Sequence, residues 1–288
     1  MDLPNEELSF EQMLAAQRTR PRVAHDAAEF RAARVGLLVF VYAVGLLLFL
    51  AIEPTKPWIL LVVTCLVALG SDGIIRDHPF GDFRGDIAAT APFLFLPTLL
   101  TLGSGLFLED VAGGYWAVPG TAIAAVLMGA VVYAEHASVD HTSEAYGVAR
   151  FILTVATYLT AFSFYSVVYT FEVSLVPAAL AVGLVSLLLS VEVLREAEAD
   201  PVRALVFAAV VGLIVAEARW GLYFLPLESY LAAVFLLLAF YLTSGLVQHH
   251  LTDDLHGAVL LEFLSIGAVG VAIVVIGRAI ESSGGITP

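Results

Sequence analysis

Long apolar segments separated by short polar ones dominate this sequence. Each apolar segment is about 20 residues long, the length that an α-helix needs to cross a hydrocarbon layer of about 30 Å. Charged or turn-forming residues bound each segment. The segments cover residues 35–53, 58–75, 87–108, 115–134, 148–170, 173–194, 204–225, 229–247 and 258–277. The pattern predicts an all-α membrane protein with nine transmembrane helices.

The tightest predicted connection lies between the fifth and sixth segments, at Thr170-Phe171-Glu172-Val173-Ser174. If residues 148–194 formed fewer spans, the total would fall to eight. The sequence therefore leaves eight spans open as the alternative to nine.

Composition supports lipid as the solvent of most of the chain. Of 288 residues, 60% are hydrophobic and 14% are charged, whereas a soluble domain has about 25% charged residues. The first 34 residues contain no apolar stretch of the kind that a cleavable signal peptide needs, so we expect the first span to be an uncleaved anchor. The net charge of −14 excludes nucleic acid as a partner, because nucleic acid selects basic surfaces.

The arginines predict the orientation of the bundle. Most of them precede the first span or flank the connections after even-numbered spans: Arg18, Arg20, Arg22, Arg31, Arg34, Arg76, Arg84, Arg150, Arg195 and Arg203. Only Lys56, Arg219 and Arg278 fall on the other side. Basic residues accumulate on the cytoplasmic side of a membrane. We therefore expect a plasma (inner) membrane protein with a cytoplasmic N-terminus and, with nine spans, an external C-terminus.

Four short patterns recur in order along the chain. Spans one and five begin alike, with Ala33-Arg34-x-x-Leu37-x-Val39-x-x-Tyr42 and Ala149-Arg150-x-x-Leu153-x-Val155-x-x-Tyr158, an offset of 116 residues. Matches at the ends of spans two and six, three and seven, and four and eight have offsets of 119, 119 and 113. The recurrence predicts two parallel four-helix repeats plus one C-terminal helix. The predicted parts are a cytoplasmic amphipathic N-terminal segment (1–33), the two repeats (34–141 and 148–256), and the final helix with an outer tail (258–288).

Two acidic loops occupy equivalent places in the predicted repeats. Their carboxylates are Asp72, Asp77, Asp82 and Asp86 in the first loop and Glu192, Glu196 and Asp200 in the second. Asp82 and Asp86, like Glu192 and Glu196, are four residues apart and would share one helix face. Clustered carboxylates suit Mg²⁺, which often shares its oxygen ligands with phosphate. Neighbouring arginines could bind that phosphate: Arg76, Arg84, Arg195 and Arg203. The alternative interpretation is a solvated acidic loop.

Histidines form a second candidate metal site. Its residues follow spans four and eight: His136, His141, His249, His250, Asp253 and His256. Imidazole with carboxylate suits Zn or Fe, and the arrangement resembles the histidine boxes of membrane desaturases and hydroxylases, although those proteins carry more histidines. Solvated helix ends are the alternative interpretation.

The layout as a whole resembles the intramembrane prenyltransferases. Those proteins have nine spans, a cytoplasmic N-terminus, two related four-helix halves and Asp-rich motifs in the same two loops. The resemblance implies that the acidic loops bind Mg²⁺–diphosphate and that the metal assists ionisation of an allylic diphosphate. The first motif of that family begins with Asn-Asp, where this chain has Ser71-Asp72, and the second is Asp-based, where this chain has mostly Glu.

Polar residues within the spans offer further candidates. Thr154, Tyr158, Tyr165 and Tyr169 form one stripe along span five, which would either line a cavity or bond to neighbouring helices. Glu217 and Arg219 lie near the outer end of span seven. Because they are two residues apart they do not share a helix face, so we expect their partners to lie on other elements.

Three classes of function remain open. The first is a non-catalytic membrane or complex component, which would contact another membrane subunit. The second is a Mg-dependent membrane enzyme acting on a lipid or prenyl diphosphate at the cytoplasmic face. The third is a small-solute transporter with a cavity between the two repeats. All three have the lipid bilayer as a partner.

Overall fold

The computed structural model describes residues 32–52, 54, 56–77, 87–112, 114–140, 142–195, 197, 200–225, 227 and 229–284. Within these ranges there are no strands, and nine helices are long and apolar enough to cross a membrane. They are the first helix (Ala32–Ala51), α2 (Pro57–Arg76), α3 (Ile87–Val111), α4 (Ala117–Ala137), α5 (Tyr146–Thr170), α6 (Leu175–Leu194), α7 (Pro201–Leu222), α8 (Ser229–Leu251) and α9 (Gly257–Gly284). A 3-10 turn, η1 (Gly114–Trp116), precedes α4. The chain is an integral membrane protein.

The structure confirms nine helices in the described part of the chain, and the alternative of eight is wrong. The decisive connection is the one between α5 and α6, where the backbone leaves the helical conformation. Glu172 has a φ of 48°, in the left-handed region that non-glycine residues seldom adopt. Glu172 lies in the turn between the end of α5 at Thr170 and the start of α6 at Leu175. The predicted N-terminal segment 1–33 lies almost wholly outside the described residues.

The start of α7 lies three residues before the predicted start at 204. Asp200 caps this helix, because its carboxylate accepts a hydrogen bond from the Val202 backbone N–H at 3.0 Å. Pro201 occupies the first turn, where its missing N–H costs nothing. Asp–Pro is therefore a local start signal that the hydropathy of the segment does not reveal.

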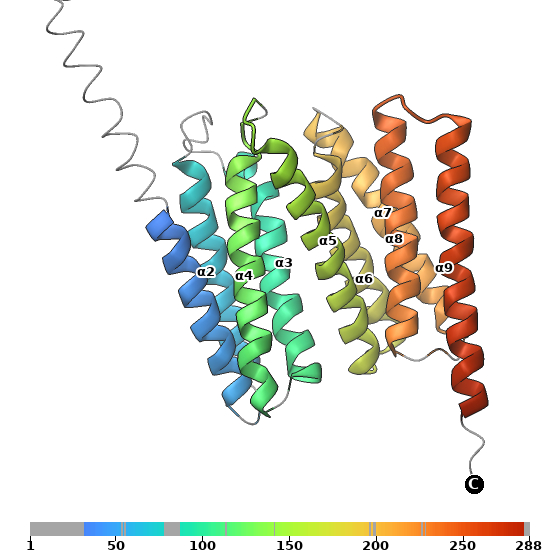
Figure 1. Ribbon diagram of the computed structural model, residues 1–288, viewed down its shortest axis with the longest axis horizontal. Helices are drawn as coiled ribbons and strands as arrows, with labels where there is room; N and C mark the ends of the chain where they lie inside the picture. Colours follow the sequence, from blue (N-terminus) through green and yellow to red (C-terminus); the bar gives the residue numbers. More distant parts are fainter. Residues whose placement is uncertain are drawn as a thin grey trace, which may run out of the picture.

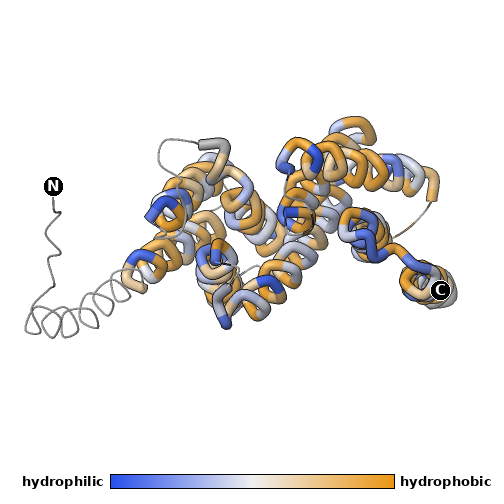
Figure 2. The backbone as a smooth tube through the Cα atoms, turned by 90° about the horizontal axis from the view of Figure 1, so that it is seen from above, coloured by the Kyte–Doolittle hydropathy of each residue, from blue (hydrophilic) through white to orange (hydrophobic). Residues whose placement is uncertain are grey.

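The helices stand side by side in an elongated bundle with the first helix at one edge and α9 at the other (Figures 1 and 2). Because successive helices run in opposite directions, one end of the bundle carries the connections after α2, α4, α6 and α8 (Figure 1). We call it the arginine-rich end, after Arg34, Arg76, Arg150, Arg195 and Arg203. The opposite end, the tryptophan end, carries Trp58, Trp116 and Trp220, which are all the tryptophans of the chain.

Helices α3 and α5 form the centre of the bundle. Helix α5 packs against α3, α4, α6 and α8, and α3 also packs against α2, α4 and α6. The core that they build is apolar, with Leu96, Met128 and Phe240 all fully buried. On the outside, large apolar side chains such as Phe40 and Ile123 are exposed by 64% and 72%. Such a surface is suited to lipid.

Several hydroxyl groups inside the bundle bond to neighbouring helices or to their own backbone. The hydroxyls of Tyr165 and Ser186 lie 2.7 Å apart, and both residues are fully buried between α5 and α6. Tyr158, on the same predicted stripe, packs edge-on against the Phe240 ring. Thr154, the first member of the stripe, is exposed and donates to the backbone carbonyl of Arg150 at 2.8 Å. These contacts favour helix packing over cavity lining as the role of the stripe.

Candidate functional site

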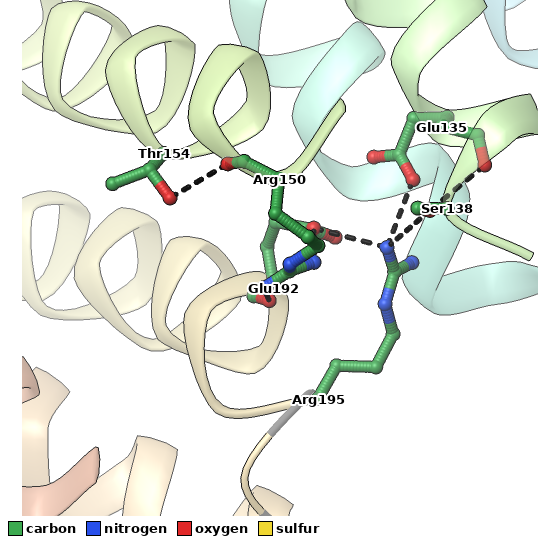
Figure 3. A network of polar contacts seen from close by, with 6 residues as sticks. All are labelled: Glu135, Ser138, Arg150, Thr154, Glu192 and Arg195. Carbon is green, nitrogen blue, oxygen red and sulfur yellow. Dashed lines mark hydrogen bonds and ion pairs between the residues drawn. The ribbon is translucent and has the colours of Figure 1, made fainter. Parts of the chain in front are cut away.

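The candidate site lies at the arginine-rich end, where the last turn of α4, the first turns of α5 and the last turn of α6 meet (Figure 3). Its polar members are Glu135, Ser138, Arg150, Glu192 and Arg195, which we call the Arg–Glu network. The way in which the helices end fixes the positions of these side chains. Helix α4 ends at Ala137, and Ser138 closes it by donating its backbone N–H to the Ala134 carbonyl at 2.8 Å and its hydroxyl to the Glu135 carbonyl at 2.9 Å.

Glu192 joins two arginines through one oxygen. Its Oε1 accepts from Arg150 Nη1 at 3.0 Å and from Arg195 Nη2 at 3.0 Å. The backbone carbonyl of Glu192 accepts a further bond from Arg150 Nη2 at 3.4 Å. One carboxylate thus connects the start of α5 to the residue that follows α6.

Arg195 extends the network to α4. Its Nη2 lies 3.1 Å from Glu135 Oε2 and 3.2 Å from Ser138 Oγ (Figure 3). The guanidinium carbon also lies 4.1 Å from the centre of the Phe93 ring, which α3 supplies. A cation over a ring face is attracted to it, most strongly where water is excluded. Groups from α3, α4 and α6 therefore contact Arg195, and α5 joins the network through Arg150 on Glu192.

The network is buried and electrically balanced. Glu135 and Glu192 are each 1% exposed, and two guanidiniums face the two carboxylates. An unpaired charge at such a place would be very costly, because protein and lipid cannot replace its hydration. Burial lowers the pKa of Arg195, but the negative charges of Glu192 and Glu135 outweigh it and hold that pKa above its usual value. Arg195 therefore stays charged throughout the accessible pH range.

Three polar atoms of the network have no hydrogen-bond partner although they are buried: Glu135 Oε1, Glu192 Oε2 and Arg195 Nη1. A buried polar atom of this kind calls for a water molecule, a proton or a ligand. Chemically, the site can hold charged groups rigidly and can take up a proton on a carboxylate. Both guanidiniums of the network are paired with carboxylates.

Simpler ion pairs lie at the same end of the bundle, near the start of the first helix and the end of α2. Arg76 Nε lies 2.6 Å from Asp72 Oδ2, and the Thr90 hydroxyl donates to Asp72 Oδ1 at 2.7 Å. Arg34 pairs with Asp77. These side chains are more exposed than those of the network, at 25–28% for the first pair and 41–51% for the second. They are therefore better hydrated and contribute less.

Comparison of the sequence with models of known protein families identifies the family of this chain. The sequence model of the family described as "Protein of unknown function (DUF5656)" matches residues 55–277. The chain belongs to the DUF5656 family. The match runs from just before α2 into α9 and contains the whole Arg–Glu network. No curated protein and no solved structure matches this DUF5656 protein.

The predicted acidic-loop site is only partly described. Asp72 and Asp77 pair with arginines, Glu192 lies in the network, and Asp200 caps α7. Of the predicted phosphate-binding arginines, Arg76 and Arg195 pair with carboxylates, while exposed Arg203 lies 5.9 Å from the centre of the Phe207 ring. Asp82, Arg84, Asp86 and Glu196 lie outside the described residues. Within the described ranges no three His, Cys, Asp or Glu side chains are grouped closely enough to hold a metal.

The predicted histidine site is likewise not assembled by the part that the structure describes. His249 and His256 both approach Asp254, at 3.5 and 3.6 Å, near the end of α8. His250 packs edge-on against Phe207. His136 lies in the last turn of α4, Asp253 follows α8 with a φ of 55°, and His141 is outside the described residues.

Sequence reasoning missed how these residues combine. From the sequence, Arg150 was used for the orientation and for the repeat pattern, and Glu135, Ser138 and Phe93 were not singled out as site residues. One signal was available, because Arg150 and Arg195 are the counterparts of Arg34 and Arg76 in the predicted repeat. Nothing in the sequence shows which carboxylates these arginines meet, since that depends on how the helix ends pack.

Proposed function

We propose that this protein is a non-catalytic component of its membrane, a rigid helical bundle that acts as a scaffold or as a subunit of a larger complex. The observation that carries the proposal is the Arg–Glu network. The partly buried guanidiniums of Arg195, which follows α6, and of Arg150, at the start of α5, are neutralised by Glu192 and Glu135 of the same chain. A diphosphate would have to displace these carboxylates, which would then be left buried and unpaired.

The test is thermal unfolding of the purified protein in detergent with EDTA, with Mg²⁺, and with Mg²⁺ plus a prenyl diphosphate. A ligand at about 100 times its Kd would stabilise the folded state by about 2.7 kcal/mol. We expect equal melting temperatures in the three conditions. A diphosphate shift that needs Mg²⁺ and is lost in the variant with Asp82→Asn and Asp86→Asn would replace this proposal with the prenyl-diphosphate enzyme.

A small-solute transporter is the second candidate, and unpartnered polar atoms inside the bundle favour it. Beyond Glu135 Oε1 and Glu192 Oε2, the buried hydroxyls of Thr157 and Ser166 on α5 have no hydrogen-bond partner. Thr157 lies seven residues after Arg150, on the same face of α5. Proton uptake by liposomes that contain the protein, measured with an enclosed pH dye, separates the two candidates. The scaffold predicts the rate of protein-free liposomes, and the transporter predicts a higher rate.

The duplication of a four-helix unit is also part of the proposal. Arg34 and Arg150, 116 residues apart, each pair with a carboxylate near the end of the following helix, Asp77 and Glu192. Arg76 and Arg195, 119 residues apart, each pair with a carboxylate one helical turn earlier. The helix pairs α2–α3 and α6–α7, and likewise α4–α5 and α8–α9, pack in corresponding ways. These parallels support two related halves, of which the second has the deeper charge network.

A further inference from the structure

Arg219 is a buried arginine at the opposite end of the molecule from the Arg–Glu network. It lies one turn before the end of α7 and is 5% exposed. Its neighbours on the same face of α7, Val211, Val215 and Leu222, are buried in the bundle. Arg219 therefore lies on the side of α7 that faces the bundle, and only a small part of it is accessible.

The described residues supply no counter-charge for Arg219. Arg34, Arg76, Arg150 and Arg195 each pair with a carboxylate, whereas Arg219 forms no ion pair with any described carboxylate. Its Nε and Nη1 are buried and have no hydrogen-bond partner. Glu217, two residues away, is exposed on a different face of the helix.

The contacts that Arg219 does make compensate its charge only in part. Its guanidinium carbon lies 4.3 Å from the centre of the Tyr169 ring, which is a favourable cation–π distance. The C-terminal end of a helix also favours a positive charge. Neither contact accepts the N–H groups of Nε and Nη1. A buried charge is normally both paired and hydrogen-bonded, so the described residues leave Arg219 short of one anionic acceptor.

The position of Arg219 along the membrane normal indicates the chemical class of the acceptor. Exposed aromatic side chains surround this end of the bundle: Trp58, Tyr115, Trp116, Phe171, Trp220, Tyr223, Phe224 and Tyr230. Belts of tryptophan and tyrosine mark the level of the lipid headgroups. At that level the abundant anionic group is phosphate, and the guanidinium fork matches phosphate oxygens with two parallel bonds.

We propose that Arg219, with Tyr169 beneath it, is a binding site for a phosphate-bearing anion at the tryptophan end of the bundle. Asp110 lies near the end of α3, also at the tryptophan end of the bundle. Its carboxylate is instead engaged by the hydroxyls of Tyr230 at 3.1 Å and Thr170 at 3.4 Å. The phosphate can come from a lipid headgroup or from free phosphate, and the site does not depend on whether the protein is a scaffold or a transporter.

The experiment measures thermal unfolding of delipidated protein in a non-ionic detergent with three probes: phosphatidylglycerol, phosphatidylcholine and inorganic phosphate. We expect a saturable rise in melting temperature with at least one phosphate-bearing probe. Phosphatidylglycerol acting where inorganic phosphate does not identifies a lipid headgroup, and inorganic phosphate acting alone identifies the free anion. No rise with any probe would overturn the proposal.

Substitutions at Arg219 test whether this residue binds the anion. Arg219→Gln should weaken the apparent affinity about tenfold or more, because it removes charge-assisted hydrogen bonds to the anion. Arg219→Lys should retain part of it. Arg203→Gln, at the other end of the same helix, is the control and should bind as the wild type does. Equal affinity of Arg219→Gln and wild type for the anion would contradict the assignment. If Arg219→Gln does not fold, the assignment is tested by the affinity of Arg219→Lys and by the titrations of the wild type.

Discussion

At the scale of single residues, Glu192 is the carboxylate of the network that pairs with two arginines. One of its oxygens serves both Arg150 and Arg195, and the residue is 1% exposed. Water cannot replace the carboxylate if it is lost. The remaining carboxylate of the network, Glu135, pairs with Arg195.

Glu192→Gln should therefore be strongly destabilising. Leaving a buried charge without its partner costs about 3–5 kcal/mol, and we expect a loss of that order. Unfolding by SDS in mixed micelles measures it. Glu217→Gln is the matched control on an exposed position of α7 and should change stability by less than about 0.5 kcal/mol. Equal behaviour of the two variants would mean that the Glu192 charge is not needed for the fold.

At the scale of helices, the packing of α6 on α7 depends on two glycines. A Cβ atom on Gly212 would lie 2.6 Å from the carbonyl oxygen of Gly183 and 2.9 Å from the Cβ of Leu187. Backbone atoms cannot yield at such distances unless the helices separate. Small residues are the usual means by which membrane helices approach closely.

Gly212→Ala should destabilise the bundle by about 1–3 kcal/mol, the usual cost of overpacking a well-packed contact. Gly221, on the same helix, has nothing within 4 Å of the position of an added Cβ. Gly221→Ala should be neutral or should stabilise by up to about 1 kcal/mol, since alanine is the better helix former. The two variants can be compared in one SDS-unfolding series, and a Gly212→Ala protein as stable as Gly221→Ala would show that α6 and α7 do not approach as described.

The helices themselves could be predicted from sequence, but their contacts could not. A transmembrane span can be recognised from consecutive residues alone, because lipid requires about 20 apolar residues in a row wherever the helix lies in the bundle. The start of α7 deviated from the prediction because Asp200 and Pro201 set it locally. The partners of Arg195 come from α4 and α6 and its ring contact from α3. Only the packing of three distant segments brings them together.

At the scale of the whole molecule, an odd number of spans places the two ends of the described chain on opposite faces of the membrane (Figure 1). The arginines gather at the end where the first helix begins, and this bias predicts that the N-terminus is cytoplasmic. Fusing a reporter that is active only in the cytoplasm to each terminus should give activity at the N-terminus alone. Activity at the C-terminus alone would reverse the orientation, and activity at both would contradict nine spans.

The central claim is that the charges at the arginine-rich end are used within the chain, where they hold α4, α5 and α6 together. A double-mutant cycle between Glu135→Gln and Arg195→Gln tests it most directly, by SDS unfolding of the wild type, both single variants and the double variant. Residues in one ion-pair network show coupling energies of about 0.5–3 kcal/mol. We predict a favourable coupling of at least about 1 kcal/mol, so that the double variant is less damaged than the sum of the single variants. Strictly additive losses would contradict the account.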